Sequence, residues 1–287
     1  MLVAMIMVPL LDLFAKLLIH DYPVLQVAWA RFAFHTLWLL PLLFWQRLHW
    51  WHLPARPGYQ LVRSLLLTIT TLSFFAAIRD NPIPNALTLL FVAPLVVVMI
   101  APFWLGESFD WQQGIAALCG FTGVLLVLRP DTDFHPSLLF ALVAGIAYAC
   151  YIMITRKLSH STEPLLTLFY TAVVGLLVLS PLVFGVWVEL DLRAIAMMAA
   201  MGLFAAVGHF LIIQACEYAT ASQLSVFNYF EIIGAITISY LAFGYWPSMD
   251  VWFGMLVISL SGLYISWREI RMTDKTVQAN DGRVEKL

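Results

Sequence analysis

Charged residues are scarce in this sequence. Asp, Glu, Lys and Arg make up 11% of its 287 residues and hydrophobic residues make up 62%, whereas soluble domains carry about 25% charged residues. Apolar runs of roughly 20 residues follow one another along the chain, and a helix of that length crosses a bilayer. The runs are apolar on all sides, which excludes the one-sided pattern of helices in water-soluble proteins. The sequence therefore predicts an all-α integral membrane protein surrounded by a lipid bilayer.

Cysteine is also rare, and the sequence lacks the motifs of several other functions. Its three cysteines, Cys119, Cys150 and Cys216, have neither metal-ligand spacing nor a disulfide framework. There is no His-Glu-x-x-His, no Gly-x-Ser-x-Gly and no phosphate-binding glycine loop. We therefore expect no metal, no cofactor, no catalytic residues and no nucleic-acid partner.

Ten apolar runs, separated by polar residues, proline or glycine, predict ten transmembrane helices. The first run contains Asp12 and Lys16 and lacks a basic leading region, so we interpret it as a retained helix rather than a signal peptide. The connections are short, and a polar tail follows Trp267. The runs lie at 2–19, 24–45, 61–79, 83–104, 111–128, 136–155, 164–187, 194–216, 221–244 and 250–267.

The distribution of Lys and Arg predicts the orientation. If the N-terminus is inside, ten of them, Arg63 included, fall on the cytoplasmic side, four, Lys16 included, fall outside, and Arg31 lies within a helix. Cytoplasmic loops of membrane proteins carry this excess of positive charge. We expect a multi-pass protein of the cytoplasmic (inner) membrane with both termini in the cytoplasm.

The two halves of the sequence share features at a nearly constant offset. Lys16 recurs as Lys157, 141 residues later, and Gly123 recurs as Gly262, 139 residues later. Each half has five predicted helices. Because five is an odd number of membrane crossings, the second half starts on the opposite side of the membrane and is inverted relative to the first, as in many secondary transporters. The expected organisation is two inverted five-helix repeats and a cytoplasmic polar tail, at residues 1–130, 131–268 and 269–287.

An ordered set of short motifs adds a family resemblance. Asn81-Pro82-Ile83-Pro84-Asn85-Ala86, Leu105-Gly106-Glu107 and Gly120-Phe121-Thr122-Gly123 in the first half are followed by Asn228-Tyr229-Phe230-Glu231 and Ser261-Gly262-Leu263-Tyr264 in the second. The chain resembles the EamA-type drug/metabolite transporter family, within it a branch that includes riboflavin importers, S-adenosylmethionine importers and metallophore exporters. One departure is Tyr245, where the family's second copy usually has an acidic residue.

The resemblance implies a secondary transporter of a small organic metabolite that works by alternating access, with proton coupling left open. Two alternatives are a membrane-embedded enzyme and a non-transporting membrane subunit. Gly114, Gly120 and Gly123 in one helix, and Gly254 and Gly262 in another, are typical of close helix packing. Such glycines serve monomers and homodimers alike, so both states stay open.

Charged residues within the spans are the candidate substrate or coupling residues, because a charge in the bilayer interior usually faces a cavity or a partner. Asp12 and Lys16 are four residues apart on one helical face, and either pair with each other or contact the substrate. Arg31 and His35 repeat this spacing on the second helix. Arg31 is suited to bind a carboxylate or phosphate, or else bonds to Asp12 or to helix-end carbonyls.

The second half contributes Glu231, with Asn228 one turn away and Tyr229 beside it, as candidates for substrate binding or proton coupling. The alternative for Glu231 is a neutral or hydrogen-bonded acid that packs between helices. Pro94 is expected to kink the fourth helix near the cavity, because it cannot donate to the carbonyl of Leu90. His209 is interpreted as a histidine that bonds between helices. Ser64, Thr68 and Thr71 share a face that either lines a cavity or bonds back to its own helix.

Overall fold

The computed structural model describes residues 1–48, 54–105, 111–128, 135–159, 161–218 and 230–284. These residues contain helices and no strand. Six of the helices are long and apolar enough to cross a membrane, and shorter apolar helices accompany them. The helices are α1 (Leu2–Asp21), α2 (Val24–Trp45), α3 (Pro57–Asp80), α4 (Ile83–Leu90), α5 (Val92–Leu105), α6 (Trp111–Leu128), α7 (Leu138–Leu158), α8 (Pro164–Val183) with the 3-10 turn η1 (Phe184–Val186), α9 (Leu192–Tyr218), α11 (Phe230–Phe243) and α12 (Met249–Val284).

Prolines set several helix boundaries. Pro57 and Pro164 are the first residues of α3 and α8, where the missing N–H of proline has no cost. The run expected at 83–104 divides at Phe91 into α4 and α5, with Pro94 in the first turn of α5. The expected kink thus takes the form of a break, since Pro94 has no N–H to donate to the carbonyl of Leu90.

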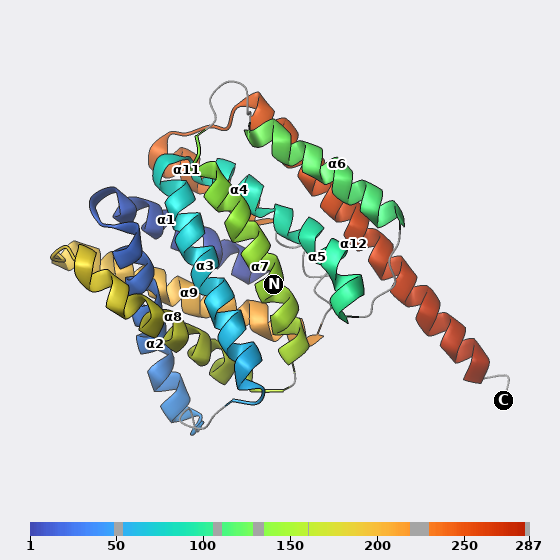
Figure 1. Ribbon diagram of the computed structural model, residues 1–287, viewed down its shortest axis with the longest axis horizontal. Helices are drawn as coiled ribbons and strands as arrows, with labels where there is room; N and C mark the ends of the chain where they lie inside the picture. The colour runs from blue at the N-terminus through green and yellow to red at the C-terminus, as the bar shows by residue number, and fades with distance from the viewer. Residues whose placement is uncertain (49–53, 106–110, 129–134, 160, 219–229, 285–287) are drawn as a thin grey trace.

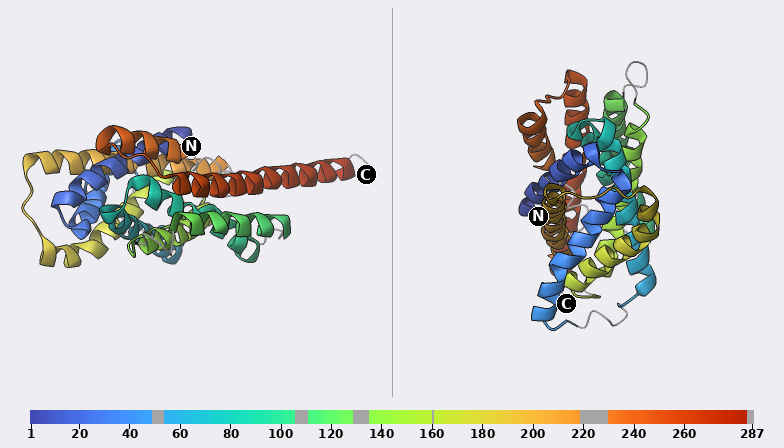
Figure 2. Two further views of the ribbon diagram at one scale, coloured as in Figure 1. Left: turned by 90° about the horizontal axis from the view of Figure 1, so that it is seen from above. Right: turned by 90° about the vertical axis from the view of Figure 1, so that its left-hand side faces the viewer.

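The helices are arranged as a central bundle with a helix pair beside it. Within the bundle α1 and α2 pack on α9, α2 also packs on α8, and α3 packs on α7 and α8. The helices α6 and α12 lie side by side along one edge (Figure 1). Figure 2 shows that α12 projects beyond the other helices; its backbone continues as helix to Val284, through most of the expected polar tail.

Hydrogen bonds between loops and helix ends define two ends of the bundle. At one end, which we name the Tyr22 end, Asn81 donates to Ser137 across 2.7 Å and the Gln26 amide pairs with the backbone of Val188. At the opposite end, which we name the Arg47 end, Arg156 donates to the carbonyl of Cys216 across 2.6 Å. Since α1 runs toward the Tyr22 end and α7 runs away from it, these two helices have opposite directions.

Glycine allows α6 and α12 to approach closely. A Cβ atom at Gly123 would lie 2.8 Å from the carbonyl oxygen of Gly254 and 2.8 Å from a side-chain carbon of Ile258. Gly120 meets Leu95 and Ser261 in the same way. The expected packing role of these glycines is confirmed.

Replacement of Gly123 by Ala should therefore destabilise the protein. The added methyl group meets backbone, which cannot move aside as a side chain can, and overpacking of this kind costs about 1–3 kcal/mol. Thermal unfolding in detergent measures the effect. Gly58→Ala is the matched control, because a Cβ there meets nothing within 4 Å and Ala favours a helix over Gly. Equal unfolding temperatures for the two variants would contradict this packing.

Candidate functional site

A small cavity of about 60 Å³ lies inside the bundle where α1, α2, α3, α9 and α11 meet. Three of the predicted site residues, Asp12, Arg31 and Glu231, line it and are buried. The structure thus brings together charged groups from helices that are far apart in the sequence. The remaining lining residues are mainly apolar and aromatic: Val8, Leu11, Leu67, Thr70, Thr71, Phe74, Phe75, Leu90, Tyr148, His209 and Ile212.

Two neutral side chains hold the Arg31 guanidinium. Its Nη1 donates to Thr71 Oγ1, and its Nη2 lies 2.7 Å from His209 Nε2. Because a guanidinium can only donate, Nε2 of His209 accepts, which places the proton of the neutral ring on Nδ1. The Nε of Arg31 has no partner in the described part of the chain. The alternative that Arg31 bonds to Asp12 or to helix-end carbonyls is therefore not what the structure shows.

Asp12 and Glu231 are near one another, and neither has a bound cation among the residues that the structure describes. Asp12 interacts electrostatically with both Arg31 and Glu231, but no ion pair to either carboxyl group is present among the described residues. A buried carboxylate is stable only when a cation or hydrogen-bond donors compensate its charge. These two groups are therefore suited to bind either protons or a cationic part of a ligand.

Lys16 does not pair with Asp12, although the two lie one turn apart. Its Nζ donates to the carbonyl oxygens of Ile78, Arg79 and Asn81, at 3.0 Å for Arg79 and 3.2 Å for Asn81. The last carbonyls of a helix lack intrahelical donors and carry partial negative charge, so the C-terminus of α3 attracts the ammonium group. Lys16 thus links α1 to α3 and lies outside the cavity lining.

His35 is fully buried, and neither of its ring nitrogens has a partner among the described residues. Its ring stacks on that of His209 with centroids 6.5 Å apart. Gly202 makes this position possible, because a Cβ there would lie 2.9 Å from the backbone nitrogen of His35. Asn228 and Tyr229, the other two candidates, lie outside the described residues.

The sequence did not predict the full role of two polar residues, His209 and Arg63. His209 was expected to bond between helices, and it does so, but its partner is Arg31 and it lines the cavity. Arg63 was counted only among the cations on the cytoplasmic side, and the structure shows it fully buried and bonded to α7 and α8. The shared face of Ser64, Thr68 and Thr71 was the signal for both residues, since this side of α3 faces inward.

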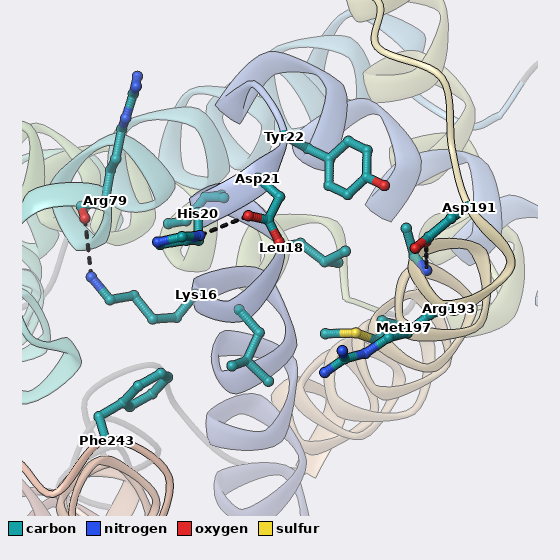
Figure 3. A pocket seen from close by; sticks show the side chains of 13 residues that line it. Lys16, Leu18, His20, Asp21, Tyr22, Arg79, Asp191, Arg193, Met197 and Phe243 are labelled. Atoms are coloured by element: carbon teal, nitrogen blue, oxygen red, sulfur yellow. Dashed lines mark hydrogen bonds and ion pairs between the residues drawn. The ribbon is translucent and has the colours of Figure 1, made fainter.

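Two larger cavities open at the Tyr22 end, and Figure 3 shows the larger of these two. One of about 400 Å³ is lined by charged side chains that include Asp21, Arg79 and Arg193, and another measures about 290 Å³. They share Lys16 and Phe243. Figure 3 shows Lys16 reaching across to the backbone of Arg79. The Tyr22 end therefore offers a polar vestibule, the name used below for these two cavities.

Comparisons with known proteins agree with one another. The sequence profile of the EamA-like transporter family matches residues 1–129 and 135–267. An S-adenosylmethionine uptake transporter of Rickettsia bellii is 26% identical over 88% of this chain and 87% of its own. A riboflavin transporter of Vibrio cholerae is 26% identical over 75% of this chain and 73% of its own. A solved crystal structure shares the fold with a TM-score of 0.67, covering 93% of this chain and 97% of that one at 14% identity.

Replacement of Thr71 by Val should destabilise the protein more than replacement of Thr70. Both threonines donate to their own helix and line the cavity, but only Thr71 also accepts from Arg31. Loss of that acceptor leaves a buried charged donor unsatisfied, which costs about 1–3 kcal/mol. Thermal unfolding of Thr71→Val and Thr70→Val in detergent tests this difference. If Thr70→Val unfolds at the same temperature as Thr71→Val, the bond to Arg31 contributes nothing.

Proposed function

Because the chain belongs to the EamA-like transporter family, we propose that it carries a small organic metabolite across the cytoplasmic membrane through the cavity at Arg31. Family membership and the transporter relatives make it a multi-pass secondary transporter rather than an enzyme. The observation that supports the location of the site is the cavity itself. It holds one cation, Arg31, and two carboxyl groups, Asp12 and Glu231, within a span-forming bundle.

Unsatisfied groups of the cavity indicate the kind of solute. In the described part of the chain, the Nε–H of Arg31 has no partner, and neither Asp12 nor Glu231 has a bound cation. Aromatic rings of Phe74 and Tyr148 complete the lining. A solute with an ionic or strongly polar part beside an apolar or aromatic part fits this lining. The relatives named for S-adenosylmethionine and riboflavin make these two compounds the first to test.

Two inverted repeats, the first in residues 1–130 and the second in 131–268, explain how the helices pack. In these repeats α1, α2, α3 and α6 of the first half correspond in order to α7, α8, α9 and α12 of the second. When each helix is replaced by its counterpart, the contact between α3 and α7 becomes the contact between α1 and α9. The contact between α2 and α9 likewise becomes the contact between α3 and α8. The α2–α8 and α6–α12 contacts map onto themselves. The opposite directions of α1 and α7 agree with inversion. The full architecture we propose has ten membrane-spanning helices.

Alternating access follows from this arrangement. Two structurally similar halves that meet at a central site can rock about it, so that the site opens first to one side of the membrane and then to the other. We place the Arg47 end in the cytoplasm, together with both termini, because Arg47, Arg56, Arg156 and Lys157 gather there. The vestibule at the Tyr22 end would then face the outside.

Proteoliposomes provide the test of this function. Purified protein should take up or exchange radiolabelled S-adenosylmethionine or riboflavin, and Arg31→Met should lower the initial rate at least about tenfold, since a hydrogen bond to a charged group contributes about 1.5–3 kcal/mol. Glu231→Gln should abolish the response to an imposed pH gradient if Glu231 carries the coupling proton. Neither change should lower the amount of folded protein below that of the wild type.

Arg47→Gln is the matched control, because Arg47 is exposed and lies far from the cavity lining. Full transport by both Arg31→Met and Glu231→Gln would show that the cavity is not the site. Wild-type transport that is indifferent to the pH gradient would remove Glu231 as a proton carrier but leave the binding role of Arg31 intact.

A further inference from the structure

Arg63 forms a second buried cationic centre, nearer the Arg47 end than the cavity. Its guanidinium joins α3 to α7 and α8: Nη1 donates to Thr155 Oγ1 across 3.5 Å, and Nη2 donates to the Thr167 carbonyl and to Thr171 Oγ1. Its Nε donates to Gln60 within α3 across 3.3 Å. We name this group of hydrogen bonds the Arg63 latch. It joins helices of the first half to helices of the second.

The partners of Arg63 are all neutral. No ion pair to Arg63 occurs within the described residues, and its charge lies instead over the ring of Tyr151, with Cζ 5.4 Å from the centroid. Removal of one partner from a buried ion pair leaves an uncompensated charge and is strongly unfavourable. Hydroxyl and carbonyl acceptors can be exchanged for water when a helix interface opens. The Arg63 latch is therefore strong enough to order three helices and still reversible.

Among the described residues, the latch has no counterpart at the Tyr22 end. In the proposed repeat, the offset of 141 residues that relates Lys16 to Lys157 also relates Phe14 to Thr155 and Arg63 to Phe204. Phe14 and Phe204 stack with centroids 5.8 Å apart, so the position that is polar between α3 and α7 is apolar between α1 and α9. The two interfaces thus differ in how readily water can replace the contact.

The latch is also connected to the cavity. The ring of Tyr151 lies between Arg63 and His209, with its edge-to-face contact to His209 at 6.1 Å between centroids. His209 in turn accepts from Arg31. A solute that displaced His209 or Arg31 would therefore change the packing of Tyr151 directly beside the latch.

We propose that Arg63 is a positioning residue that keeps the Arg47 end closed, and that its bonds to Thr155, Thr167 and Thr171 break each time that end opens. The proposal rests on the alternating access proposed above. It assigns to Arg63 the balance between the two open states rather than any contact with the solute.

Cys216 is a native reporter for this opening. It lies in the last turn of α9 at the Arg47 end, is fully buried, and is close enough to Arg63 to interact with it electrostatically. The experiment uses the full chain in membranes, with Cys119 and Cys150 replaced by Ser. The rate at which N-ethylmaleimide alkylates Cys216 is measured, and Cys216→Ser in the same background defines the unlabelled level.

Arg63→Met should raise the alkylation rate at least about tenfold, because it removes several hydrogen bonds to a charged group. Thr171→Val, which removes one acceptor and keeps the shape, should raise the rate less and serves if Arg63→Met does not fold. Arg63→Lys should restore part of the wild-type protection, since an ammonium group still has three donors. Arg47→Gln, an exposed arginine at the same end, should leave the rate unchanged.

Gly123→Ala distinguishes a latch from general loosening, because it weakens the distant α6–α12 contact. An equal rise in Cys216 alkylation in Gly123→Ala and Arg63→Met, at equal unfolding temperatures, would overturn the latch. So would wild-type alkylation rates in folded Arg63→Met and Thr171→Val. The assay needs no transported solute. If Cys216 stays unlabelled in every variant, both alternating access and the latch are contradicted. If wild type and variants are labelled at the same rate, only the latch is contradicted.

Discussion

The interior of a bilayer offers no water to satisfy a polar group, and this constraint decides where the charges of this chain lie. Lys16, Arg31 and Arg63 are cations within its helices, and each is bound by neutral acceptors of the protein. Lys16 binds the carbonyls at the end of α3, Arg31 binds Thr71 and His209, and Arg63 binds threonines of α7 and α8. As none of the three forms an ion pair in the described part of the chain, the carboxyl groups of Asp12 and Glu231 are left for a ligand or a proton. The electrostatics of the site thus follow from how the cations are bound.

The family motif has a structural role at the Tyr22 end. Asn81 donates to Ser137 at the start of the second half, and the hydroxyl of Tyr245 donates to Asn85 across 2.9 Å. Burial raises the pKa of the Tyr245 phenol above its ordinary value. A neutral phenol can donate a hydrogen bond, whereas an ionised carboxylate can only accept one. Tyr245 therefore connects the two segments, 1–129 and 135–267, that the family profile matches.

The sequence was sufficient to predict a helical membrane protein and its family but not the partners of the charged residues. Apolar length alone located α1 and α2 almost to the residue, and spacing placed Asp12, Arg31 and Glu231 in the interior, where the structure brings them to one cavity. The partners of Lys16 and Arg63 depend on how neighbouring helices are rotated and how deep they lie in the membrane. Composition does not determine either property. The burial of Arg63 could not be predicted for this reason: at the third residue of an apolar run, a buried arginine and an exposed one have the same pattern.

Distances at both ends of the bundle test the account most directly. Spin labels at Asp21 and Arg193 report the Tyr22 end, and labels at Arg47 and Glu163 report the Arg47 end, all at exposed positions in a cysteine-free chain reconstituted in liposomes. Pulsed electron paramagnetic resonance should give two distances at each end, with reciprocal populations, and Arg63→Met should increase the population in which the Arg47 end is wide. A single unchanging distance at both ends, in protein that transports, would contradict alternating access around the Arg31 cavity.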